Sequence, residues 1–133
     1  MKMEFDALRD FAKRYTAAWC SRNPASVAAF FSPEGSLRVN DGVPAAGRLA
    51  ITAVAHGFML AFPNLQVLMD EVVLDVDGAI YRWTLVGTNN GPGGTGNAVR
   101  IRGFEQWTMG VDGLIAESLG HFDSGDYERQ LKA

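Results

Sequence analysis

The sequence contains few of the residues that build disulfides and metal sites. Its 133 residues include one cysteine, Cys20, and two histidines, His56 and His121. One cysteine cannot form an internal disulfide, and the apolar helical neighbours of Cys20 indicate a buried thiol in a reducing compartment, so we expect a cytoplasmic protein. Because no two of these residues have the spacing of metal ligands, we also expect no metal.

Long apolar runs and a strong net charge are also absent. The longest uncharged stretch, residues 49–65, contains His56, Pro63 and Asn64, and its apolar residues recur at helical spacing. This pattern indicates a helix of the core rather than a membrane span. The net charge of −3 provides no electrostatic attraction to nucleic acids or anionic membranes, so we expect neither as a partner.

What remains is the composition of a globular protein. Hydrophobic residues make up 47% of the chain and charged residues 20%, which is typical of a folded domain. A chain of 133 residues is long enough to bury a hydrophobic core without disulfides or metals. We therefore expect residues 1–133 to form a single domain.

Apolar side chains at steps of three and four predict three helices in the first half of the chain. The first covers residues 5–19, where large apolar groups line one face. The second covers residues 24–31, with Asn23 as a favoured N-cap and Pro24 at the first helical position. The third covers residues 48–62 and ends where a proline follows.

Strand-like alternation replaces the helical pattern after residue 65. Asp77-Gly78 and Asp112-Gly113 lie between alternating runs, and Asp-Gly in that context predicts tight hairpin turns. A Ser-Pro-Glu-Gly sequence at residues 32–35 predicts a turn, and residues 126–131 predict a closing helical turn. The expected strands are a short edge strand at 37–39 and a meander at 65–76, 79–88, 98–109 and 114–123.

Two positions interrupt the alternation of these strands, namely Asp70-Glu71 and Gly103. Bulges at both positions would bend the sheet sharply. Three helices packed on one face of a strongly curved, mixed but mainly antiparallel sheet give an α+β fold. We expect a small ligand to bind in the hollow between the sheet and the helices.

Two further patterns have more than one interpretation. Residues 91–96 match G-x-G-x-x-G, but the β-patterned residues 97–102 follow where a nucleotide site needs a helix, so we interpret the run as a loop that could cover the pocket. Arg82, Arg100 and Arg102 fall on neighbouring strands. They would form either a solvated outer row or an inward clamp for an anion.

The last predicted strand contains the first candidate for chemistry. Odd-numbered residues from Ile115 to Asp123 share one face if no bulge intervenes. If apolar side chains of the helices cover Asp123 at the strand end, its carboxylate would lose water and its pKa would rise. A raised pKa suits a general acid or base at neutral pH. Aspartate is equally a preferred N-cap for the closing turn, so the pattern leaves both roles open.

Several short motifs resemble one known family. Residues 112–117 read D-G-x-I-x-E, Phe122-Asp123 follows, and residues 129–131 read R-Q-L. Residues 83–91 are similar to a W-T-x-x-G-T-H-x-G strand and loop, and the opening helix ends in Ala18-Trp19. In this order the motifs resemble the SnoaL-like polyketide cyclases of the nuclear-transport-factor-2-like superfamily.

The resemblance implies a cone-shaped fold with one pocket, no cofactor and often a homodimer through the outer sheet face. In the cyclases an aspartate at the place of Asp123 removes a proton next to a carbonyl before an aldol closure, which favours an inward-facing Asp123. Two residues depart from the pattern. Asn89 replaces the histidine of G-T-H, and Gln106, which cannot exchange protons at neutral pH, stands where active members often have histidine.

The first functional hypothesis is a cofactor-independent lyase or isomerase that acts on a small apolar carbonyl compound. Asp123 would be the general acid/base, and Gln106 or His121 would bind or polarise the carbonyl. The expected pocket-lining residues are Trp19, Phe58, Phe62, Trp83, Leu85, Phe104 and Leu119.

Two other hypotheses remain open. The main alternative is a non-catalytic protein of the same fold that binds a small hydrophobic molecule. The third is an assembly module that works through its outer sheet face. The residues expected to supply that face are Val99, Ile101, Trp107 and Met109.

Overall fold

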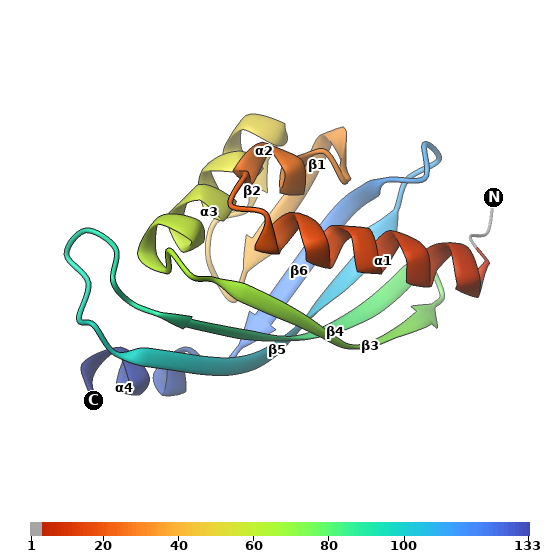
Figure 1. Ribbon diagram of the computed structural model, residues 1–133. Coiled ribbons are helices and arrows are strands. Elements are labelled where there is room, and N and C mark those ends of the chain that lie inside the picture. The colour runs from red at the N-terminus through yellow and green to blue at the C-terminus, as the bar shows by residue number, and fades with distance from the viewer. Residues whose placement is uncertain (1–3) are drawn as a thin grey trace.

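The computed structural model describes residues 4–133, which form helices packed on a curved six-stranded sheet (Figure 1). The strands, in sheet order, are β2 (Ala45–Ala46), β1 (Phe31–Val39), β6 (Ile115–Phe122), β5 (Ala98–Met109), β4 (Gly78–Thr88) and β3 (Gln66–Asp75). Neighbouring strands are antiparallel except β1 and β6, which are parallel. The predicted α+β class and mixed, mainly antiparallel sheet are confirmed.

The helices are α1 (Phe5–Cys20), α2 (Pro24–Ala28), α3 (Arg48–Ala61) and α4 (Ser124–Lys132). The first three lie over one face of the sheet, which we call the inner face, and α4 packs against β5 (Figure 1). The sequence predicted three helices and a closing turn. The predicted turn at residues 126–131 is a full helix, α4, which begins two residues earlier and ends one residue later than the turn.

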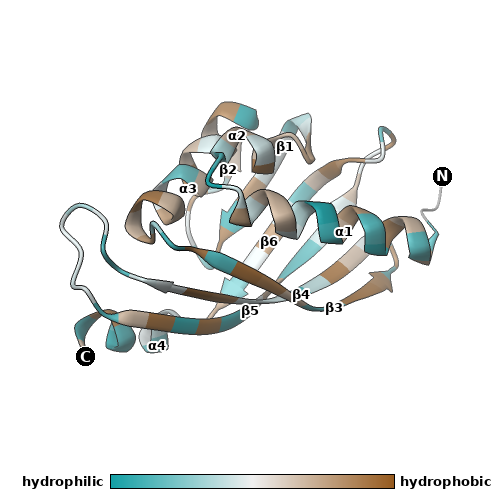
Figure 2. Ribbon diagram, in the orientation of Figure 1, coloured by the Kyte–Doolittle hydropathy of each residue, from teal (hydrophilic) through white to brown (hydrophobic). Residues whose placement is uncertain are grey.

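Helix α1 buries the apolar face that its spacing predicts, except for Phe5 at its start, which is 44% exposed. Leu8, Phe11, Tyr15 and Trp19 are buried, while the charged residues between them are exposed. The same alternation of polar and apolar residues is visible along the ribbon of α1 (Figure 2). Because Tyr15 lies on the buried face, α1 delivers a hydroxyl group to the interior.

Helix α2 begins as its sequence predicts but ends earlier. The side chain of Asn23 accepts a hydrogen bond from the N–H of Ala25 at 3.1 Å, and Pro24 is the first helical residue. The helix ends at Ala28 rather than near residue 31, because Phe31 already belongs to β1.

The turn predicted at residues 32–35 is wrong, because these residues lie within β1. The pairing of β1 with β6 is irregular between Phe31 and Ser36, so the strand absorbs the Pro-Glu-Gly segment as a bulge. Pairing with β6 therefore overrides the local turn preference of these residues.

Both predicted hairpins are confirmed, and one of them turns earlier than expected. The β3–β4 turn is Val76-Asp77, so that Gly78 begins β4 and a Cβ there would collide with the backbone of Trp107. In the β5–β6 turn Gly113 has φ = 77°, as an Asp-Gly turn requires. The predicted bulge in β3 is also confirmed, since its register shifts between Met69 and Glu71.

The predicted bulge at Gly103 is wrong. Strands β4 and β5 pair without interruption over their whole length, and Gly103 lies directly opposite Trp83. The alternation of β5 therefore continues through Gly103, with odd residues on the inner face and even residues on the outer face. The burial of the residues alternates accordingly along β5.

This alternation corrects the predicted assembly surface on β5. Three of its four expected residues, Val99, Ile101 and Trp107, are buried on the inner face and cannot meet a partner. Arg100 and Arg102 are exposed on the outer face, so they form a solvated row rather than an inward clamp.

The glycine-rich loop at residues 89–97 is anchored to the end of α3. The side chain of Asn89 donates to the carbonyl of Ala61 at 3.2 Å and accepts from the N–H of Thr95 at 2.8 Å. A Cβ on Gly91 would collide with the carbonyl of Leu60, so glycine allows the loop to lie directly against the helix. The loop leads into β5, as the sequence predicted, rather than into a helix.

Neither a membrane-crossing helix nor a metal-binding cluster occurs among residues 4–133. No helix in this range combines the length and the apolar character needed to cross a bilayer. No group of three or more His, Cys, Asp or Glu side chains in the same range is placed to hold a metal ion. Cys20 is a free, half-buried thiol whose sulfur accepts the N–H of Val67 at 3.3 Å.

Candidate functional site

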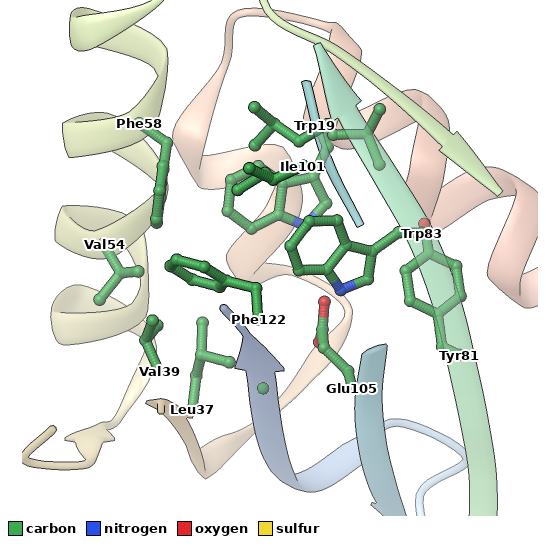
Figure 3. Close-up of a pocket in the computed structure, with 13 residues that line it drawn as sticks. Trp19, Leu37, Val39, Val54, Phe58, Tyr81, Trp83, Ile101, Glu105 and Phe122 are labelled. Atoms are coloured by element: carbon green, nitrogen blue, oxygen red, sulfur yellow. The ribbon is translucent and has the colours of Figure 1, made fainter. Parts of the chain in front are cut away.

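A small apolar cavity lies between the inner sheet face and helices α1 and α3 (Figure 3). Its volume is about 60 Å³. The lining residues are Trp19, Leu37, Val39, Val54, Phe58, Val67, Tyr81, Trp83, Leu85, Ile101, Glu105, Gly120 and Phe122. In this described lining Glu105 is the one acidic residue.

Glu105 is buried because the alternation of β5 directs it to the inner face. The residue is only 7% exposed. Its carboxylate accepts hydrogen bonds from the hydroxyl of Tyr15 on α1, the Nε1–H of Trp107 on β5 and the hydroxyl of Ser118 on β6. These donors offset the loss of water that burial imposes on a carboxylate.

The two oxygens of this carboxylate are unequally occupied. Oε1 accepts from Tyr15 at 2.9 Å, from Trp107 at 3.1 Å and from Ser118 at 2.7 Å. Oε2 has only a 3.2 Å contact with the same Tyr15 hydroxyl, whose single proton is shared with Oε1. Since no other donor among residues 4–133 bonds to Oε2, this oxygen can accept a further hydrogen bond.

Burial also sets the protonation of the groups around Glu105. Loss of water raises the pKa of Glu105, while hydrogen bonds from Ser118, Trp107 and Tyr15 act in the opposite direction. The pKa of Tyr15 lies well above its ordinary value, first because of burial and second because of the charge on Glu105. Tyr15 therefore stays protonated and serves as a donor.

Tyr81 forms a rigid aromatic wall next to Glu105. Its ring stacks on that of Trp107 with centroids 4.9 Å apart and an angle of 14° between the planes. Its hydroxyl is hydrogen-bonded to the hydroxyl of Thr16, and burial raises the pKa of Tyr81 above its ordinary value. This hydroxyl therefore already has a partner and remains neutral.

Trp83 contributes a polar atom without a partner. Its Nε1 is buried and makes no hydrogen bond within the described residues. Figure 3 shows the Nε1 edge of the indole directed toward the carboxylate of Glu105. A Cβ on Gly103 would lie 2.7 Å from Cη2 of Trp83, so the glycine provides the space that the indole occupies.

Four of the seven predicted pocket residues line the cavity, and three lie elsewhere. The four are Trp19, Phe58, Trp83 and Leu85. Phe62 is fully buried outside the cavity lining, with its ring 6.3 Å from that of Tyr127. Phe104 and Leu119 lie on the outer face, because each is the neighbour in sequence of an inward-facing residue.

The three residues expected to perform chemistry also lie outside the cavity lining. Asp123 is exposed, and its side chain accepts the N–H of Asp126 at 3.0 Å as the N-cap of α4. Gln106 is exposed on the outer face, and the ring of His121 lies 4.9 Å from that of Phe104. The expected inward orientation of Asp123 is therefore corrected. Strand β6 ends one residue earlier, and the free N–H groups of α4 attract the carboxylate.

Sequence reasoning missed Glu105, although a signal for it was present. Val99, Ile101 and Trp107 are large apolar residues at odd positions, so an unbroken strand places Glu105 among them on the core face. The expected bulge at Gly103 obscured this pattern, because a shift of one residue exchanges the two faces.

Comparison with known proteins identifies the family of the chain. The family described as the SnoaL-like domain matches residues 12–118. The chain belongs to the SnoaL-like family. A search of curated proteins finds no match.

Solved structures share the fold of this SnoaL-like chain over nearly its whole length. A protein from Jannaschia sp. CCS1, described as a SnoaL-like polyketide cyclase, has a TM-score of 0.85 at 17% identity and covers 100% of this chain and 98% of its own. TsrD from Streptomyces laurentii has a TM-score of 0.84 at 21% identity, with 98% of each chain covered. A protein with a ketosteroid isomerase-like fold from Catenulispora acidiphila, solved in complex with trimethylamine, has a TM-score of 0.81 at 14% identity, with 92% of each chain covered.

Proposed function

We propose that this SnoaL-like chain is a cofactor-independent lyase or isomerase that moves a proton on a small apolar carbonyl compound. The observation that supports the proposal is the unequal occupation of the Glu105 carboxylate at an apolar cavity. Oε1 is held by three donors, which orient the group, while Oε2 only shares the hydroxyl of Tyr15, and Glu105 belongs to the cavity lining. In this proposal Glu105 takes the role that the sequence assigned to Asp123.

The reaction begins when Oε2 of the ionised Glu105 takes a proton from the carbon next to the carbonyl group. The carbon–hydrogen bond breaks, and its electron pair forms an enolate with the negative charge on oxygen. In an isomerase the proton returns from Oε2 to another carbon of the same molecule. In an aldol closure, the enolate carbon forms a bond to a second carbonyl carbon of the molecule, the π bond of that carbonyl breaks to give an alkoxide, and the proton moves from Oε2 to the alkoxide oxygen. Burial raises the pKa of Glu105 toward the range that suits a general base.

The test measures the exchange of carbon-bound hydrogen for deuterium in a simple apolar ketone. Cyclopentanone is incubated with the protein in D₂O, and the loss of its α-proton signal is followed by NMR. We expect the wild-type protein to accelerate exchange above the buffer rate, and Glu105→Gln to lower that acceleration by about 100-fold or more. Because glutamine keeps the shape of glutamate, the fold and the affinity for the ketone should change little.

Asp123→Asn is the matched control, because it removes a carboxylate of the same charge outside the cavity. We expect this variant to exchange the ketone at the wild-type rate. Wild-type exchange in Glu105→Gln would reject Glu105 as the base, and loss of exchange in Asp123→Asn would return that role to Asp123.

A specific observation also favours the second candidate, a protein that binds a small hydrophobic molecule without reaction. The donors to Glu105 come from α1, β5 and β6, so the carboxylate also joins three elements of the fold. For such a protein the ketone binds, as chemical-shift changes show, while exchange stays at the buffer rate in every variant.

Two expectations from the sequence accompany the proposal, a cytoplasmic location and a homodimer through the outer sheet face. The unpaired thiol of Cys20 supports the first. Partly exposed apolar side chains on the outer face, including Ile80, Phe104 and Leu119, support the second. Sedimentation of the purified chain tests the homodimer, because a monomer at micromolar concentration would contradict it.

A further inference from the structure

We propose that Trp83 determines which ligands the cavity accepts, because its indole N–H donates a hydrogen bond to a ligand oxygen that lies beside Oε2 of Glu105. The ligand class is a neutral molecule that is apolar apart from a hydroxyl or carbonyl oxygen at its edge. This inference rests on the proposed function only in using the same cavity, since it concerns binding and not proton transfer.

The first observation is the unpartnered Nε1 of Trp83. A buried N–H group without an acceptor lowers the stability of the folded protein by about 1–3 kcal/mol. Such groups are therefore rare in folded proteins and call for an explanation, such as a role in binding. This one belongs to a residue of the cavity lining and is directed toward Glu105 (Figure 3), yet the two side chains are not bonded to each other within the described residues. An oxygen atom placed between them would satisfy the indole N–H.

The second observation is that the other polar groups near this point already have partners. The indole of Trp107 and the hydroxyls of Tyr15 and Ser118 bond to Glu105, and the hydroxyl of Tyr81 bonds to Thr16. The buried Nε1 of Trp83 therefore remains as a donor without a partner, and the Oε2 of Glu105 as an acceptor that only shares the hydroxyl of Tyr15. A hydroxyl group matches both, because it accepts from the indole and donates to the carboxylate.

The third observation is that the indole is held in place before a ligand arrives. Gly103 lies under its six-membered ring, and the ring of Phe122 meets it edge-on with centroids 6.1 Å apart. The donor therefore has a fixed direction, and binding loses little side-chain freedom. The rest of the lining is mostly aliphatic or aromatic, which disfavours a charged ligand.

The experiment compares two probes that differ at one group, 4-fluorophenol and 4-fluorotoluene. Their dissociation constants are measured by fluorine NMR for the wild-type protein and for Trp83→Phe. We expect the substitution to raise the dissociation constant of 4-fluorophenol by about 3- to 10-fold, because one hydrogen bond between neutral groups is lost. The dissociation constant of 4-fluorotoluene should stay within about twofold, because phenylalanine keeps an apolar wall.

Trp19→Phe is the matched control, because Trp19 also lines the cavity and its Nε1 is not among the buried unpartnered atoms of the described residues. We expect it to change the affinities of both probes by the same factor. A second measurement uses the wild-type protein alone. The indole N–H signal of Trp83 should move downfield with 4-fluorophenol and not with 4-fluorotoluene.

The inference would be overturned if Trp83→Phe raised the dissociation constants of both probes by the same factor. It would also be overturned if 4-fluorophenol did not shift the indole N–H signal of Trp83. These outcomes are separate from those of the ketone experiment. If Glu105→Gln exchanges the ketone at the wild-type rate while Trp83→Phe discriminates between the probes, the acid/base proposal fails and the role of Trp83 stands. If Glu105→Gln loses exchange while both probes weaken equally, the role of Trp83 fails and the acid/base proposal stands.

Discussion

The two faces of strand β5 place polar side chains in opposite environments. On the inner face, Glu105 and Trp107 are buried and bonded to each other and to residues of α1 and β6. On the outer face, Gln106 is exposed, and its amide has one 3.5 Å contact with Asp75. Residues that are adjacent in sequence thus differ in nearly every physical property that matters for chemistry.

The difference follows from water. An outer side chain keeps its hydration, so its contacts contribute little and its removal costs little. An inner side chain has exchanged water for protein partners, so each lost partner leaves a buried group unsatisfied. The inner face therefore combines a large effect on stability with a carboxylate whose pKa is raised by burial, which supports the proposed role of Glu105.

The largest expected effect compares Trp107→Ala with its neighbour Gln106→Ala. We expect Trp107→Ala to lower the free energy of unfolding by about 3–5 kcal/mol, because it opens a cavity and removes a donor from Glu105. Gln106→Ala should change it by less than about 0.5 kcal/mol. Urea denaturation measures both values, and similar losses in the two variants would contradict the proposed division between the faces.

The next effect concerns the close approach at Gly103. We expect Gly103→Ala to destabilise the protein by about 1–3 kcal/mol, because its methyl group would collide with Trp83 and with the carbonyl of His121. Gly57→Ala in α3 is the matched control, since a Cβ there meets no atom within 4 Å. That substitution should stabilise the protein by about 0.5–1 kcal/mol through helix propensity. Opposite signs in chemical denaturation are the expected result, and equal signs would contradict the tight packing under Trp83.

A third prediction uses the pKa of Glu105. Because burial raises this pKa, the folded protein holds the proton more tightly than the unfolded chain does. The stability contributed by the protonated form is complete below the unfolded pKa of about 4.3 and is lost as pH rises through the raised value. Within that window the wild-type protein should lose about 1.4 kcal/mol per pH unit relative to Glu105→Gln. Urea denaturation at several pH values measures the difference, and a pH-independent difference would show that burial does not raise this pKa.

The smallest effect is expected at Asp123. Asp123→Ala removes the N-cap of α4 and should lower the free energy of unfolding by about 1 kcal/mol. Asp123→Asn should cost only a few tenths of a kcal/mol, because asparagine is an equally good cap. Thermal denaturation compares the two variants. A larger loss in Asp123→Asn than in Asp123→Ala would contradict the capping role.

Local pattern predicted the fold well. The spacing of apolar residues located α1 and α3, Asn23-Pro24 located the start of α2, and Asp112-Gly113 located a hairpin. Each of these features depends on residues within a few positions of each other, so the sequence contains the full cause. The turn at residues 32–35 was predicted from an equally strong local signal and is wrong, because pairing with distant β6 draws that segment into β1.

The identity of the buried carboxylate depended on tertiary structure. The sequence alone determined that residues 98–109 form a strand and that Asp123 is a candidate for chemistry or for capping, but it did not identify Glu105. A bulge at Gly103 would exchange the faces of the residues that follow it, so the bulge decides whether the odd or the even residues of β5 beyond Gly103 face the core. The regular pairing of Gly103 with Trp83 on β4 rules the bulge out. Continuous pairing with β4 buries Glu105 under α1, while the start of α4 holds Asp123 in solvent. Neither outcome is encoded within one strand, because each requires elements far apart in the chain to meet.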